Sequence, residues 1–295
     1  MFVYTFWEPR EKIPFYLQLC METWEKFLPN ATIIVLDYKN IGEFIDVREL
    51  GLNLFSGRLS LPQIADAIRV ALLAKHGGVW LDIDTIILNS NAEQYFLPDE
   101  NHRIIFFGDP VEKFCHIAFI NTPPNSMCMN LWREFIREKI WNLNSSTFVN
   151  WNFLGNGFIN NYAQLHTNEI KIIDRNLAMP ELKLISKSVT YEKSYPIYYF
   201  LQSHHLADVN ADMLLLHNSW TPPLFKEIPP EKFFHIDCTM VNVLAEALEI
   251  HLPPPPYAVP YRSLKLVYGY KIKIPLRLGR EIFLCVYDGE DAQIF

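Results

Sequence analysis

Several features are missing from this sequence, and each absence excludes a class of protein. No run of about 18 apolar residues occurs, which is the least that a membrane-spanning helix needs. The first residues lack the basic segment, apolar core and small-residue cleavage site of a secretory signal. The five cysteines stand singly, without a Cys-x-x-Cys pair, so neither a disulfide framework nor a zinc site is indicated. We therefore expect a cytoplasmic protein, at most peripheral at the inner face of the membrane.

The sequence also lacks an excess of positive charge. It has 26 Lys and Arg residues against 33 Asp and Glu residues, a net charge of -7. This balance argues against a protein that binds the phosphate backbone of a nucleic acid. What the chain does have is length and apolar content, since half of its 295 residues are hydrophobic. It can bury a sizeable core, as one large domain or two modest ones.

Segments with strand-like and helix-like patterns alternate along the chain, which predicts an α/β fold. The β-prone segments are 2–7, 31–36, 79–88, 103–107, 117–120, 171–173 and 213–216, and the helical ones are 16–28, 60–76, 126–143 and 237–251.

The clearest local signals surround the second predicted helix. Ser60 is a suitable N-cap, with Pro62 in the first turn and Gln63 at the capping-box position. Gly77 and Gly78 supply its C-terminal stop. A helix between these signals leads directly into the predicted strand 79–88.

Two aspartates on that strand are the first candidate site. Alternate strand residues share a face, so Asp82 and Asp84 are expected to point the same way at a sheet edge where α/β proteins bind ligands. Two convergent carboxylates suit Mg²⁺ or Mn²⁺, with substrate phosphates and waters completing the coordination. The alternative is a polar strand end with solvated carboxylates.

A second candidate pair lies on the preceding helix. Asp66 and Arg69 are three residues apart and therefore share a helix face, where they could hold sugar hydroxyls or a phosphate. The alternative is an ordinary surface ion pair.

Taken together, these motifs resemble a known family. Asp66-x-x-Arg69 on a helix, Gly77-Gly78, and Trp80-Leu-Asp82-x-Asp84 are similar to the sugar-binding region of Asp-x-Asp glycosyltransferases, specifically the capsular polysaccharide synthesis and mannosyltransferase-like group. The opening segment 2–7 and the late segment 216–220 resemble further motifs of that group.

The resemblance implies a GT-A type, Rossmann-like single domain with a mixed, mostly parallel sheet, and it assigns roles to residues. It implies a nucleotide-sugar donor and Mn²⁺ or Mg²⁺. The implied catalytic residues are Asp82, Asp84 and Arg69; the implied donor-binding residues are Tyr4, Phe6, Trp7, Asp66, Arg69, Asp82, Ser219 and Trp220; and the implied metal ligands are Asp82, Asp84, His217 and Ser219. His217 could equally be a core histidine at a strand end.

The expected activity is a metal-dependent hexosyl transfer from a nucleotide-diphosphate sugar to a glycan acceptor of a surface polysaccharide or glycolipid, and the resemblance favours retention of configuration. Asp82-Ile-Asp84-Thr85 also fits the Asp-x-Asp-x-Thr pattern of aspartyl-phosphate phosphohydrolases, although the later elements of that class are absent from the sequence. A non-catalytic sugar-binding module is the other alternative.

The end of the chain has a different composition. Four consecutive prolines begin at Pro253, so residues 1–252 are predicted to be the catalytic domain and 253–295 a proline-rich linker with a basic appendage. Residues 261–280 contain six Lys and Arg residues and no acid. They could contact anionic lipid, which would suit a lipid-linked glycan acceptor, or form an ordinary solvated face.

Overall fold

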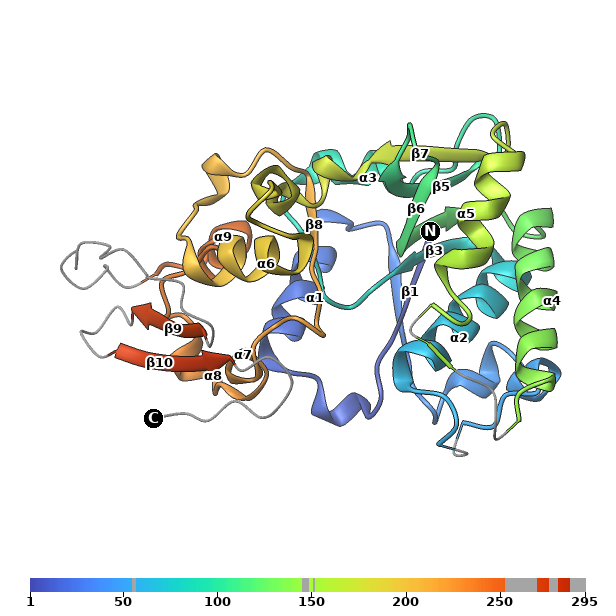
Figure 1. The fold of residues 1–295 in the computed structure, drawn as a ribbon, viewed down its shortest axis with the longest axis horizontal. Helices are drawn as coiled ribbons and strands as arrows, with labels where there is room; N and C mark the ends of the chain where they lie inside the picture. The colour runs from blue at the N-terminus through green and yellow to red at the C-terminus, as the bar shows by residue number, and fades with distance from the viewer. Residues whose placement is uncertain (55–56, 145–148, 151, 253–269, 276–280, 287–295) are drawn as a thin grey trace. The chain divides into compact units, whose positions relative to one another are not determined.

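The computed structural model describes residues 1–54, 57–144, 149–150, 152–252, 270–275 and 281–286. The predicted proline-rich linker and most of the basic segment lie outside the described residues, so the boundary at residue 253 and the membrane contact remain predictions. The chain divides into two compact units (Figure 1). The first unit comprises Met1–Ile13, Leu28–Ile83 and Asn91–Ala178, and the second comprises Pro14–Phe27, Asp84–Ser90 and Met179–Phe295.

A six-stranded sheet forms the centre of the first unit. Its strands are β1 (Phe2–Phe6), β2 (Thr32–Leu36), β3 (Gly78–Leu81), β5 (Ile104–Asp109), β6 (Phe114–Thr122) and β7 (Ile170–Asp174), in the order β2-β1-β3-β6-β5-β7. The pairs β1–β2, β1–β3 and β5–β7 are parallel, whereas β6 is antiparallel to β3 and to β5. The predicted α/β class with a mixed, mostly parallel sheet is therefore confirmed.

Helices α2 (Leu61–His76), α3 (Glu93–Phe96), α4 (Met127–Trp141) and α5 (Asn156–Leu165) belong to the same unit. α2 has the predicted ends. The Ser60 amide donates to Gln63 Oε1 at 2.9 Å, and Gly77 closes the helix with φ at +64°. A Cβ at Gly77 would lie 2.4 Å from the backbone nitrogen of Pro124, so this position requires glycine for space as well as for conformation. The buried face of α2 packs against α4, and both helices contribute to the core of the unit.

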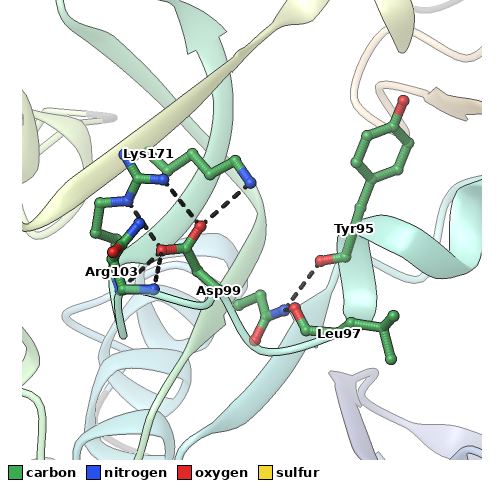
Figure 2. A network of polar contacts seen from close by, with 7 residues as sticks. Tyr95, Leu97, Asp99, Arg103 and Lys171 are labelled. Carbon is green, nitrogen blue, oxygen red and sulfur yellow. Dashed lines mark hydrogen bonds and ion pairs between the residues drawn. The ribbon is translucent and has the colours of Figure 1, made fainter.

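An ion-pair network joins the segment before β5 to the edge strand β7 (Figure 2). The carboxylate of Asp99 accepts from Arg103 Nε at 2.9 Å and from Arg103 Nη2 at 3.0 Å, and it lies 3.2 Å from Lys171 Nζ. Hydrogen bonds from Arg103 and Lys171 hold the pKa of Asp99 well below its usual range, although burial opposes them. Nearby, Asn121 Nδ2 donates to the carbonyls of Tyr95 and Leu97.

The second unit contains α1 (Phe15–Phe27), α6 (Tyr191–Pro196), α7 (Pro223–Glu227), α8 (Pro230–Phe233), α9 (Thr239–Ala247), a two-stranded sheet of β4 (Thr85–Ile87) and β8 (Met213–Leu215), and the hairpin of β9 (Tyr270–Pro275) and β10 (Glu281–Val286). α1 holds β4 through two buried hydrogen bonds. Trp24 Nε1 donates to the Thr85 carbonyl at 2.7 Å, and the Ile87 amide donates to Thr23 Oγ1 at 2.9 Å.

The prediction of one strand over 79–88 is wrong. The first unit's sheet ends at Leu81 in β3, residues Asp82 to Asp84 form a turn, and β4 pairs antiparallel with β8 in a different sheet. The expectation that both aspartates share one strand face therefore fails. The physical reason is that the two halves of the segment pair with different partners, β3 with β6 and β4 with β8.

In the described part of the chain, no helix is both long and apolar enough to cross a membrane. Four cysteines, Cys20, Cys115, Cys128 and Cys238, are buried free thiols, in agreement with a sequence that shows no disulfide framework.

Candidate active site

In the first unit, one guanidinium joins two carboxylates. Arg69 Nη2 lies 3.3 Å from Asp66 Oδ1 and 3.1 Å from Asp82 Oδ1, and Arg69 Nη1 donates to the Ile117 carbonyl of β6. The two helical residues predicted to share a face do so, and they meet the first aspartate of the Asp-x-Asp pair. We call Asp66, Arg69 and Asp82 the arginine clamp.

The arginine clamp is buried, so it is not an ordinary surface ion pair. The side chains of Arg69 and Asp66 are 5% and 11% exposed, whereas that of Asp82 is 32% exposed. Burial raises the pKa of Asp66 to about 7, with Arg69 acting in the opposite direction and Asp82 adding to the rise. Burial also raises the pKa of Asp82, again opposed by Arg69. The carboxylates of Asp66 and Asp82 thus share one buried positive charge, the guanidinium of Arg69.

Trp80 was not among the predicted site residues, yet it holds this cluster together. Its Nε1 donates to Asp82 Oδ1 at 2.7 Å, and the centre of the Arg69 guanidinium lies 5.0 Å from the Trp80 ring centroid. A tryptophan two residues before an aspartate at the end of a strand lies on the same side of that strand, which was the available signal.

Gly155 and Asn156 lie at the start of α5, and Gly155 is next to Asp66 of the arginine clamp. Gly155 precedes α5, and a Cβ added there would be 2.9 Å from Asp66 Oδ2. Asn156 begins the helix, and its Nδ2 reaches the Cys115 carbonyl at 3.4 Å. Any larger residue at position 155 would force the Asp66 carboxylate to move.

The other aspartate is held inside the second unit. Asp84 Oδ2 accepts from the Asn218 amide at 2.5 Å, and the Leu216 amide donates to the Asp84 carbonyl at 3.1 Å. Tyr16 of α1 donates its hydroxyl to Asn218 Oδ1 at 2.6 Å. Asp84 is 8% exposed and Tyr16 is fully buried. Tyr16 was not predicted as a site residue, because it lies more than 200 residues from its partner.

The late motif forms an aromatic cluster in the same unit. His217 Nε2 is 2.7 Å from the Tyr191 hydroxyl, and the His217 amide donates to the Tyr195 hydroxyl at 3.1 Å. The ring centroids of His217 and Trp220 are 4.4 Å apart. Burial lowers the pKa of His217 to about 4, so its imidazole is neutral near pH 7. Ser219 is exposed, in contrast to these rings.

The opening aromatic residues are mostly core residues. Tyr4 and Phe6 of β1 are 3% and 8% exposed and belong to the hydrophobic core of the first unit, where Phe6 packs against Tyr38. Trp7 follows the strand, is half-buried, and donates its amide to the Leu36 carbonyl. Of these three predicted donor-facing residues, Trp7 has the most exposed surface to offer a ligand.

The carboxylate of Asp82 offers oxygen donors of the kind that hard cations bind. Within the described ranges, no group of three or more His, Cys, Asp or Glu side chains is arranged to hold a metal. Asp82 Oδ1 is occupied by Trp80 and Arg69, whereas no described residue bonds its Oδ2. A divalent cation carried by a diphosphate needs only one or two protein carboxylates, because phosphate and water oxygens complete its coordination.

A known family and a curated relative each match part of the chain. Residues 2–176 match the family described as "Capsular polysaccharide synthesis protein". The chain is 28% identical over 160 residues to the glycosyltransferase afumC of Aspergillus fumigatus, a match over 47% of this chain and 40% of the relative, so it spans less than half the length of that relative.

Solved structures match the chain at low similarity. The galactosyltransferase LgtC, in complex with donor and acceptor sugar analogues, is 11% identical with a TM-score of 0.41, over 86% of this chain and 98% of that chain. A glycosyltransferase involved in glycosylation of the major capsid of PBCV-1 is 12% identical with a TM-score of 0.41, over 77% and 97%. The family match spans more than half of the sequence and includes the arginine clamp: the chain belongs to the family of capsular polysaccharide synthesis proteins.

Proposed function

We propose that this chain is a metal-dependent glycosyltransferase that moves a sugar from a nucleotide-diphosphate donor to a glycan acceptor, with retention of configuration. The observation that carries the proposal is the arginine clamp, in which buried Arg69 and Trp80 fix one oxygen of Asp82 and leave its Oδ2 available. Membership of the capsular polysaccharide synthesis family supports it. A surface polysaccharide or a lipid-linked glycan is the acceptor class that this family suggests.

We assign the metal to Asp82 and Asp84. When bound, Mn²⁺ or Mg²⁺ would neutralise the charge of the diphosphate leaving group. Ser219 is a further proposed ligand, and its exposure supports that role. His217 is the weaker candidate, because its Nε2 is already engaged by the Tyr191 hydroxyl.

We propose that the remaining residues bind the donor or hold Asp82 in position. Asp66 and Arg69 are too buried to offer much surface to the donor, so we place their contribution in holding Asp82. Trp220 and Trp7 are only half-buried and retain ring surface for the nucleotide and diphosphate. We keep Tyr4 and Phe6 as proposed donor-side residues that act from the hydrophobic core of the first unit.

Retention needs no dedicated base in the protein if the departing phosphate oxygen accepts the proton of the acceptor hydroxyl. Catalysis is then electrostatic and positional, since the charge that develops on the leaving group meets groups that are already fixed. Asp84 is held by the Asn218 amide and Asp82 by Trp80, so neither carboxylate needs to reorganise during the reaction.

The direct test is a panel of UDP- and GDP-sugars incubated with the purified chain in Mn²⁺, in Mg²⁺ and in EDTA, with release of the nucleoside diphosphate measured by chromatography. We expect turnover of one donor that stops in EDTA and returns with added Mn²⁺. Cleavage of simple phosphomonoesters without donor turnover would instead favour the phosphohydrolase. Donor binding without turnover under every condition would favour a non-catalytic sugar-binding module.

The hydrogen bond from Tyr16 to Asn218 yields a second prediction. Tyr16→Phe removes the donor to Asn218 Oδ1 and loosens the loop whose amide binds Asp84. We expect the Mn²⁺ concentration at half-maximal activity to rise about tenfold, which corresponds to about 1.4 kcal/mol, the scale of one hydrogen bond.

Tyr199→Phe is the matched control for Tyr16→Phe. Tyr199 is also a fully buried tyrosine of the second unit, and its hydroxyl donates to Glu181 rather than toward Asp84. It should lower the thermal midpoint without changing the Mn²⁺ requirement. An equal shift in Mn²⁺ requirement for both variants would show that Tyr16 acts only through general stability.

A further inference from the structure

A groove on the first unit lies apart from the arginine clamp. It has a volume of about 1000 Å³ and is lined by residues of α4, of α5 and of the short helix Val47–Leu50. α4 contacts both α5 and that short helix, and Figure 1 shows α4 and α5 at one edge of the unit. None of the lining residues belongs to the arginine clamp. We call this feature the aromatic groove.

Aromatic rings in fixed positions form the floor of the aromatic groove. Phe158, Tyr162 and His166 follow one another at four-residue spacing, with ring centroids 6.0 and 4.1 Å apart, and Phe135 of α4 lies 5.3 Å from Phe158. The Tyr162 hydroxyl is anchored to Glu169 at 2.7 Å. These rings are held by their neighbours, so a ligand would not have to order them.

One of the rings that line the aromatic groove is open to solvent. Trp141 is 76% exposed although it is the last residue of α4, and its indole is seated over Gly51, where an added Cβ would lie 3.5 Å from Trp141 Cε3. Leu131, one of the other lining residues, is 45% exposed. Exposed apolar surface of this kind, with polar residues around it, is typical of a binding site.

The charged residues that line the aromatic groove indicate which class of ligand it could bind. Glu49, Glu134 and Glu138 line the groove together with Arg48 and Arg137, and the two arginines are paired with Asp46 and Glu134. Acids outnumber bases, which disfavours phosphate, nucleic acid and anionic lipid. Carboxylates accept hydrogen bonds from hydroxyl groups, and flat rings pack against the C–H face of a sugar.

We propose that the aromatic groove is a binding site for a neutral oligosaccharide chain, separate from the site of sugar transfer. A groove of this volume takes several sugar rings, with Trp141 and Phe158 as stacking surfaces and Glu49 and Glu138 as hydroxyl acceptors. The inference goes beyond the proposed transfer reaction and does not depend on it. On an enzyme of glycan synthesis, such a site would keep a growing polymer close between successive additions.

The test is affinity electrophoresis of the full chain in native gels that contain dextran, galactomannan, xylan or a soluble β-glucan, without any donor. We expect at least one polysaccharide to retard the protein, and Trp141→Ala and Glu138→Gln each to weaken that binding about tenfold or more. Val111→Ala, an apolar residue of the same unit that is 85% exposed and outside the groove, should bind as the unaltered chain does. Asp82→Asn should also bind normally, which separates this site from the transfer site.

Two results would overturn the proposal. One is the absence of retardation by every polysaccharide, or retardation that Trp141→Ala leaves unchanged. The other is a dimer in analytical ultracentrifugation that Trp141→Ala dissociates, since the groove would then be an interface with a second copy of the chain. Donor hydrolysis by Trp141→Ala should equal that of the unaltered chain, so loss of the proposed transfer function would be detected independently.

Discussion

Asp84→Asn is expected to reduce sugar transfer by about 10²- to 10³-fold or more while the protein stays folded. The amide keeps the shape of the carboxylate, and its oxygen can still accept from the Asn218 amide. What disappears is the negative charge, and with it the electrostatic contribution of Asp84 to binding Mn²⁺. Because Asp84 is 8% exposed, removal of that charge should not lower the thermal midpoint.

The same measurement distinguishes Asp84 from other acids of the chain. Asp174→Asn is the matched control, since Asp174 caps a short helix at an exposed position by accepting from the Asn176 amide, which asparagine can also do. Its transfer rate and Mn²⁺ requirement should not change. Full activity of Asp84→Asn at ordinary Mn²⁺ concentration would remove Asp84 from the metal site and leave Asp82 as its only proposed carboxylate.

The sequence predicted those elements whose signals are local. The capping box at Ser60 and Gln63 and the stop at Gly77 bounded α2 to within a residue, because each signal acts within one turn of the helix. Asp66 and Arg69 were placed on one face for the same reason. Their meeting with Asp82 followed from a strand that directly succeeds the helix.

The break between Asp82 and Asp84 could not be predicted from the local sequence. Apolar, β-prone residues continue on both sides of it, so the pattern alone indicates one long strand. The outcome is decided by partners that are remote in the chain: β6 for the first half, and β8 with the Asn218 amide for the second. Tyr16 was missed for this reason too, because its bond to Asn218 spans 202 residues.

The second large effect is expected from Asp99→Asn, which breaks the ion-pair network between the segment before β5 and strand β7 (Figure 2). An amide cannot balance Arg103 and Lys171, and one of its two ends is a donor facing other donors. Because the Asp99 side chain is only 3% exposed, we expect the free energy of unfolding to fall by about 3 kcal/mol. Chemical denaturation at pH 7 measures this loss.

Asp46→Asn is the control for Asp99→Asn. Asp46 also accepts two hydrogen bonds from the side chain of an arginine, Arg48, and these bonds lower its pKa to about 2. The Arg48 side chain is 87% exposed, so water replaces the pair at little cost and no measurable change in stability is expected. Equal losses for the two variants would mean that charge number, rather than burial, determines the effect.

The pH dependence of unfolding provides an independent check on Asp99. The pKa of its carboxyl is depressed in the folded state, so its contribution is fully present above the pKa of the unfolded chain, near 4, and is lost as the pH falls below that value. The unaltered chain should therefore lose stability more steeply than Asp99→Asn between pH 5 and pH 2. The two curves should approach each other as the pH falls, because the contribution of the Asp99 charge is lost progressively between its pKa in the unfolded chain and its lower pKa in the folded state. Parallel curves over the whole range would show that Asp99 stabilises the fold through packing rather than through its charge.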